Sequence, residues 1–207
     1  MSDDRILSRV QEYYDEKLRA HGATPRGVDW NSSESQELRF AQLAKLIDGS
    51  RAFSVNDYGC GYGALADYLE RAQYQFQYVG FDISTQMITK AQELHPQAKF
   101  ISDRDQLQPA DYPLASGIFN VRLETEEAAW KEYMLAVLET MNSLSSTGFA
   151  FNALTKYSDA EFMRPDLYYA DPLFFFDYCK TQYSRFVTLL HDYQLYEFTI
   201  LVRKWQS

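Results

Sequence analysis

The sequence predicts an α/β fold built on a doubly wound, mostly parallel β-sheet. Short apolar runs alternate with helix-length segments between residues 51 and 154, the usual pattern of parallel strands and crossover helices. A glycine-rich turn at residues 59–63 joins one of these strands to the next helix. Near the end of the chain, strand-like runs at 186–191 and 196–202 are separated by a short turn, so the last strand should run antiparallel.

The length and composition suit one soluble domain, 1–207. At 207 residues and 24.1 kDa the chain can bury a full core. Its net charge of −9 argues against a polyanionic partner, because nucleic-acid binding depends on Lys and Arg. No apolar stretch approaches the ~20 residues that span a bilayer, and the N-terminus lacks a signal-peptide pattern. We expect a cytoplasmic protein with neither a nucleic-acid nor a membrane partner.

The cysteines and histidines predict neither a disulfide nor a metal site. Cys60 and Cys179 are far apart, and the three histidines are not clustered. We expect Cys60 to be a small, buried side chain.

Two helices are predicted before the glycine-rich turn. Residues 4–20 place apolar side chains at helical spacing, and residues 34–47 repeat the pattern after a loop that contains Trp30. The first helix either packs on the sheet or covers a ligand with Tyr13 or Tyr14, and the sequence leaves both possibilities open.

The glycine-rich turn predicts a binding loop. Gly59, Gly61 and Gly63 follow a strand that ends near Asp57, and glycines there let the backbone N–H groups approach a ligand. No Lys or Arg between residues 53 and 70 offsets the Asp57 carboxylate, which would oppose a pyrophosphate and favour an ammonium. S-adenosylmethionine has no phosphate, and its methionine end carries an ammonium.

A second acid follows the next strand. Residues 78–82 read as a short buried strand ending at Asp82, where a carboxylate can accept both hydroxyls of a ribose. Gly59-x-Gly61-x-x-Ala64 with a downstream acid also fits the dinucleotide fingerprint. A nicotinamide-dependent oxidoreductase therefore stays open as an alternative.

The combined pattern resembles the class I S-adenosylmethionine-dependent methyltransferases, in particular bacterial enzymes that act on small molecules. The residues that carry the resemblance are Asp57, Gly59, Cys60, Gly61, Gly63 and Asp82-Ile83-Ser84. It implies a seven-stranded Rossmann-like sheet with an antiparallel C-terminal strand and an N-terminal helical cap. It also implies in-line methyl transfer from S-adenosylmethionine to a small-molecule acceptor, leaving S-adenosylhomocysteine. A non-catalytic relative that serves as a partner subunit is a further alternative.

The resemblance assigns cofactor contacts along the chain. Arg39, in a segment similar to one that precedes the glycine motif in these enzymes, would hold the methionine carboxylate, although it could be a surface arginine. Asp103, at the end of a predicted strand at 98–103, would bind the adenine amine or cap a turn. The full expected set is Arg39, Asp57, Gly59, Cys60, Gly61, Asp82, Ile83, Met87, Ser102 and Asp103.

The later elements complete the sheet and supply the acceptor site. We expect a helix at 84–94 with Ser84 as its N-cap, a fourth strand within 111–120 that begins at Pro113, a helix at 125–142 and a strand at 148–154. The chain then divides into a cap at 1–50, a cofactor-binding core at 51–154, an acceptor lid at 155–183 and a strand pair at 184–204.

The predicted acceptor contacts lie in the cap, the core and the lid: Tyr13, Tyr14, Trp30, Asn120 and Tyr168. If the acceptor is a hydroxyl, His191 is the predicted general base, since histidine titrates near neutral pH. A structural role for His191 remains the alternative.

Overall fold

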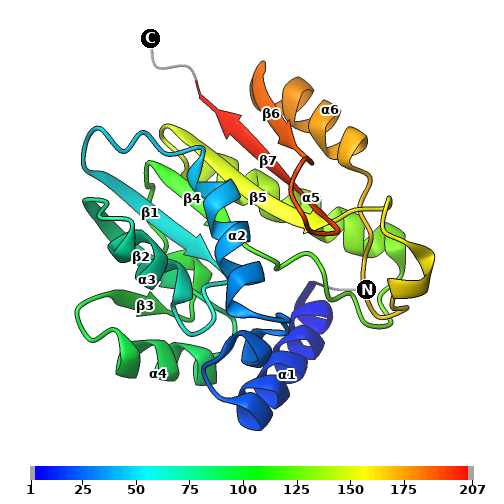
Figure 1. The fold of residues 1–207 in the computed structure, drawn as a ribbon, viewed down its shortest axis with the longest axis horizontal. Coiled ribbons are helices and arrows are strands. Elements are labelled where there is room, and N and C mark those ends of the chain that lie inside the picture. Colours follow the sequence, from blue (N-terminus) through cyan, green and yellow to red (C-terminus); the bar gives the residue numbers. More distant parts are fainter. Residues whose placement is uncertain (1–2, 205–207) are drawn as a thin grey trace.

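Within residues 3–204, which the computed structural model describes, seven strands form one sheet in the order β3-β2-β1-β4-β5-β7-β6 (Figure 1). Residues 1–2 and 205–207 of the predicted domain lie outside that range. The strands are β1 (Phe53–Tyr58), β2 (Phe76–Phe81), β3 (Lys99–Ile101), β4 (Tyr112–Ala115), β5 (Gly148–Leu154), β6 (Phe186–Leu190) and β7 (Glu197–Arg203). The predicted doubly wound sheet is confirmed.

Strand direction follows the prediction as well. Strands β1 to β5 pair in parallel, and β7 lies antiparallel between β5 and β6. The connections diverge from β1 and β4 to opposite sides of the sheet. In open α/β sheets this reversal leaves a crevice beyond the carboxyl ends of the strands, where ligands bind.

Helices cover both faces of the sheet (Figure 1). On one face, α2 (Ser33–Ala44), α3 (Ala64–Arg71) and α4 (Thr85–Leu94) contribute Phe40, Leu65 and Ile88 to a common buried cluster. On the other face, α5 (Glu127–Leu144) and α6 (Pro172–Gln182) contribute Trp130 and Phe175 to a second cluster. The sheet core thus leaves its carboxyl edge free for a site.

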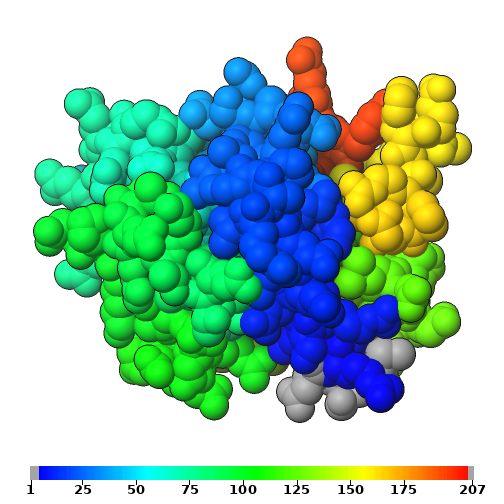
Figure 2. Space-filling model, turned by 90° about the horizontal axis from the view of Figure 1, so that it is seen from below, coloured from blue at the N-terminus to red at the C-terminus, as the bar shows by residue number. Residues whose placement is uncertain are grey.

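The N-terminal segment lies across the carboxyl edge of the sheet and covers the space beyond it. Helix α1 (Asp3–His21) and the 3-10 turn η1 (Pro25–Val28) lie below the arrowheads of β1 and its neighbours in Figure 1. Figure 2 shows this segment, coloured blue, across the middle of the face, with the yellow lid segment beside it. Helix α2 then begins at a capping box, in which the Ser32 and Ser35 side chains each accept a hydrogen bond from the other's backbone N–H.

Two details of the prediction are wrong. Strand β3 ends at Ile101, so Ser102 and Asp103 lie in the following loop, where η2 (Arg104–Gln106) begins. Pro113 is the second residue of β4. Pairing of β4 with β5 begins only at Leu114, so the missing N–H of Pro113 precedes that ladder.

The lid segment contains the short turn η3 (Ala160–Phe162). None of the helices within residues 3–204 combines the length and the apolar character needed to cross a membrane.

Candidate functional site

The glycine-rich loop is held against the end of β2. The N–H groups of Gly59 and Cys60 both donate to the carbonyl of Phe81, at 2.7 and 2.9 Å. Gly59 has a φ of +81°, and a Cβ there would lie 2.2 Å from the Ile118 side chain. Only glycine satisfies both the left-handed backbone and this close approach.

A pocket opens beside the loop, beyond the carboxyl ends of β1, β2 and β4. We call it the cofactor pocket. Its lining includes Tyr14, Trp30, Gln36, Asp57, Gly59, Cys60, Gly61, Tyr62, Asp82, Ile83, Met87, Gly117, Ile118 and Tyr133. The structure therefore brings together seven of the ten predicted cofactor contacts.

Asp57 is a buried acid in this pocket. Its side chain accepts a hydrogen bond of 2.6 Å from the Tyr78 hydroxyl, and the residue is only 3% exposed. Burial raises the pKa of Asp57 to about 7; the Tyr78 hydrogen bond opposes this rise and the nearby charge of Asp82 adds to it.

Asp82 organises the opposite wall. Its two carboxylate oxygens accept hydrogen bonds from the N–H groups of Gly61 and Ser84, each at 2.9 Å. Burial raises the pKa of Asp82 to about 6, although these two donors favour the ionised form. No Lys, Arg or His is among the described residues that line the pocket. The cofactor pocket is thus an acidic site without a cation of its own.

Ser102 and Asp103 do not line the cofactor pocket. Asp103 is exposed, and its carboxylate accepts from the backbone N–H of Asp105 and the side chain of Gln106. The early end of β3 explains this position, because the loop turns away before Ser102. The structure places Asp103 in the turn-capping role that the sequence left open.

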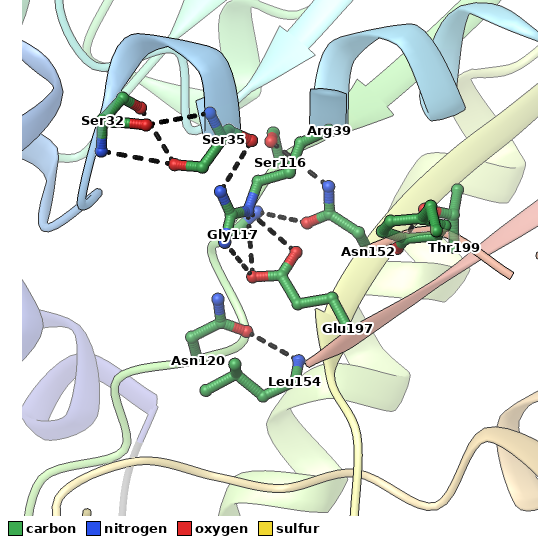
Figure 3. A network of polar contacts seen from close by, with 11 residues as sticks. Ser32, Ser35, Arg39, Ser116, Gly117, Asn120, Asn152, Leu154, Glu197 and Thr199 are labelled. Carbon is green, nitrogen blue, oxygen red and sulfur yellow. Dashed lines mark hydrogen bonds and ion pairs between the residues drawn. The ribbon is translucent and has the colours of Figure 1, made fainter. Parts of the chain in front are cut away.

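Arg39 has a protein carboxylate as its partner. Its guanidinium donates to both carboxylate oxygens of Glu197 at 2.8–2.9 Å and to the Ser35 carbonyl at 2.8 Å (Figure 3). Arg39 does not line the cofactor pocket. The resemblance implied that Arg39 holds the methionine carboxylate; in the structure the carboxylate beside its guanidinium is that of Glu197 on β7.

Gln36 was not predicted as a site residue. It lies in the cofactor pocket, where its Oε1 accepts a hydrogen bond of 3.1 Å from the Tyr62 hydroxyl. That bond turns the amide nitrogen away from Tyr62, and Gln36 Nε2 donates to no other residue that the structure describes. Gln36 lies one helical turn before Phe40 on α2, so both side chains lie on the same face of the helix and both line the pocket. This spacing was the signal in the sequence that could have identified Gln36.

A second pocket adjoins the first. We call it the outer pocket. Tyr14, Val28 and Trp30 line both pockets. The outer pocket is further lined by residues from the loop after β4, the lid, the β6–β7 turn and the start of β7, including Asn120, Phe162, Arg164, Tyr169, Gln194, Tyr196 and Glu197.

Trp30 lies at the boundary between the pockets. The Arg39 guanidinium stacks on its ring, 3.8 Å from the centroid. A Cβ on Gly117 would lie 2.2 Å from the same indole, so Gly117 is needed for this approach. The side-chain amide of Asn152 fixes that glycine, since its Oδ1 accepts from the Gly117 N–H at 2.7 Å (Figure 3).

The other predicted acceptor contacts are divided between the pocket and its surroundings. Asn120 lines the outer pocket. Tyr13 lines neither pocket, and its hydroxyl donates a hydrogen bond of 2.8 Å to the Asp29 carboxylate. Tyr168 is only 9% exposed, belongs to the core and lines neither pocket.

His191 follows β6 as expected, but it is exposed and lines neither pocket. Its ring lies near those of Tyr157 and Phe198. Strand β7 separates β6 from β5, so the carboxyl end of β6 lies to one side of the pocket. This geometry does not support a base role for His191.

Similarity to known proteins agrees with the fold and with the glycine loop. A sequence profile described as a methyltransferase domain matches residues 55–148. The Mycobacterium tuberculosis (strain ATCC 25618 / H37Rv) protein named "Putative methyltransferase Rv1506c" is 50% identical over 163 residues. The alignment covers 77% of this chain and 98% of that protein.

Solved structures share the fold at lower identity. Magnesium protoporphyrin IX methyltransferase (ChlM) from Synechocystis PCC 6803, with bound SAM, matches with a TM-score of 0.67 and 18% identity over 99% of each chain. The 1,6-didemethyltoxoflavin-N1-methyltransferase of Burkholderia thailandensis matches with a TM-score of 0.65 and 15% identity, over 99% of this chain and 91% of that one.

A relative of 50% identity that aligns along nearly its whole length establishes the family, and the strand order and acidic glycine-loop pocket agree with it. The chain belongs to the class I S-adenosylmethionine-dependent methyltransferases.

Proposed function

We propose that this enzyme transfers the methyl group of S-adenosylmethionine to a small-molecule acceptor held in the outer pocket. The observation that carries the proposal is the shared wall of Tyr14, Val28 and Trp30, which places the outer pocket directly beside the cofactor pocket. The ChlM and toxoflavin enzymes, whose names specify small-molecule acceptors, support the same class.

The residues of the cofactor pocket fit S-adenosylmethionine. Its sulfonium and ammonium suit a pocket that contains two acids and no cation, and Asp57 is the proposed ammonium partner. Asp82 would accept the ribose hydroxyls, and Ile83 and Met87 would contact the adenine. Gln36 Nε2, with no acceptor among the described residues, is the proposed donor to the methionine carboxylate.

The chain contributes mainly positioning. S-adenosylmethionine supplies an electrophilic methyl group when it is bound. Trp30 and Tyr14 would align the acceptor at the boundary of the pockets, and orientation alone can supply ~7–11 kcal/mol of the barrier. The cap and lid would exclude water. Family membership favours this reaction over the nicotinamide-dependent and non-catalytic alternatives.

The acceptor class can be tested with methyl-labelled S-adenosylmethionine. The full-length enzyme should label compounds in the small-molecule fraction of a cell extract and should leave bulk tRNA and DNA unlabelled. Label in the nucleic acids, with none in the small-molecule fraction, would contradict the proposed acceptor class.

Asp82→Ala should weaken S-adenosylhomocysteine binding at least about tenfold, because hydrogen bonds to a charged group contribute ~1.5–3 kcal/mol each. Asp103→Ala removes an equivalent acid that lies outside the cofactor pocket, so its affinity should match the wild type. Titration calorimetry measures both. Equal losses in the two variants would contradict the assignment of Asp82.

Gln36→Met keeps the side-chain length but removes the amide donor. We expect S-adenosylhomocysteine to bind roughly tenfold more weakly, in line with a lost hydrogen bond to a carboxylate. The affinity for 5′-methylthioadenosine, which has no carboxylate, should not change. A similar loss for both ligands would show that Gln36 acts on the shape of the pocket alone.

Cofactor affinity should depend on pH through Asp57. The Asp57 pKa of about 7 means that the acid becomes neutral as the pH falls below that value, while an ammonium partner requires the carboxylate. S-adenosylhomocysteine affinity should therefore fall about tenfold per pH unit below 7.

In Asp57→Asn this step should disappear, and the weaker step that remains near pH 6 belongs to Asp82. Calorimetry between pH 5.5 and 8 checks both. A flat wild-type profile between pH 6 and 7 would rule out the ammonium role of Asp57.

A further inference from the structure

The two pockets differ in electrostatic character. Among the described residues, the cofactor pocket is lined by the acids Asp57 and Asp82 and by no cation, whereas the charged residues that line the outer pocket are two acids and two arginines. From this balance, and resting on the proposed function of the outer pocket, we infer that the acceptor is an uncharged molecule. An ionised acceptor would lose its hydration on entering the outer pocket, and no unpaired charge in the pocket would compensate for that loss.

Arg39 and Glu197 form the first matched pair. The Glu197 side chain is completely buried and that of Arg39 is 9% exposed. Three hydrogen bonds of 2.8–2.9 Å join the two groups (Figure 3). Bidentate pairing of this kind satisfies both charges within the protein. Neither group therefore offers a free charge to a carboxylate, a phosphate or an ammonium.

Asp29 and Arg164 form the second pair, at 3.3 Å, and each has one further charged partner. Lys17 lies 2.7 Å from Asp29, and Asp166 lies 2.5 Å from Arg164. The wider cluster therefore also contains equal numbers of cations and anions. Its charges hold α1, η1 and the lid together, and no net charge is left for a ligand.

The groups that remain available are neutral. Asn120 is 5% exposed; its Oδ1 accepts from the Leu154 N–H, while its Nδ2 donates to no residue within 3–204 (Figure 3). The Tyr14 hydroxyl likewise has no hydrogen-bond partner in the described chain. The rings of Trp30, Phe162 and Tyr196 offer flat apolar contacts. These groups suit a neutral acceptor with hydrogen-bonding groups and a flat face.

A neutral acceptor also allows the electrons and the proton of the methyl transfer to be accounted for. A neutral hydroxyl or nitrogen gives its lone pair to the new bond to carbon, and the electrons of the S–CH₃ bond pass to sulfur. The acceptor then releases its proton to water. The products are a neutral methylated compound and S-adenosylhomocysteine.

The first experiment determines the charge of the natural product. The small-molecule fraction labelled by the enzyme is passed over anion- and cation-exchange resins at neutral pH. We expect the enzyme-dependent label in the unretained fraction. Retention of that label on either resin would overturn the inference while leaving the small-molecule acceptor intact, whereas absence of any labelled small molecule would overturn both.

The second experiment measures binding and needs no turnover. Full-length enzyme saturated with S-adenosylhomocysteine is titrated with benzyl alcohol, benzoate and benzylammonium by ligand-observed NMR. Wild type should prefer benzyl alcohol over either ion by at least about tenfold. Glu197→Gln, which leaves Arg39 unmatched, should gain about tenfold in benzoate affinity.

Two further variants keep this test decisive. Asp166→Asn also leaves surplus positive charge beside the outer pocket, at a more exposed pair, and should show the same gain in benzoate affinity if Glu197→Gln does not fold. Glu93→Gln makes the same change in net charge at an exposed pair on α4 and should have no effect. Equal wild-type affinities for the three probes, or no gain of benzoate affinity in the folded variants, would overturn the inference.

Discussion

Two carboxylates, the buried Asp57 and the partly exposed Asp82, lie at the ends of adjacent strands, and none of the described residues that line their pocket is a cation. The site is built around this constraint. Raising the Asp57 pKa from 3.8 to about 7 costs on the order of 4 kcal/mol. The folded state binds the extra proton, so stability falls as the pH rises from 3.8 towards 7. An acid kept at this cost is typical of a functional site. A cationic ligand bound beside Asp57 would offset the cost of burying its carboxylate.

The ion pair between Arg39 and Glu197 has a different role. A buried pair of this kind contributes little net stability, because desolvation offsets the attraction. Its value lies in position: the pair connects α2 to the start of β7, and its guanidinium supports the Trp30 ring. The pair thus sets the boundary between an acidic pocket and a charge-balanced one. Each pocket then favours a different kind of ligand.

The sequence predicted the parts of the site that depend on neighbouring residues. Gly59, Asp57 and Asp82 belong to strand–turn units whose geometry is local, and the structure brings them together as expected. Arg39 was harder, because its partner Glu197 lies 158 residues away. His191 was placed at the correct strand end, but its distance from the pocket depends on strand order. No local pattern in the sequence specifies that order.

The N-terminal helix lies against both pockets through Tyr14. Three consecutive residues of α1 have three separate contacts. Tyr13 donates to Asp29 on the lid side, Tyr14 lines both pockets, and Asp15 accepts from the hydroxyl of Ser84, the N-cap of α4 that follows Asp82. The helix is therefore held both beside the cofactor pocket, through Ser84, and beside the outer pocket, through Asp29. Tyr14 thus borders both pockets at a position fixed by the contacts of its two neighbours in the chain, Tyr13 and Asp15.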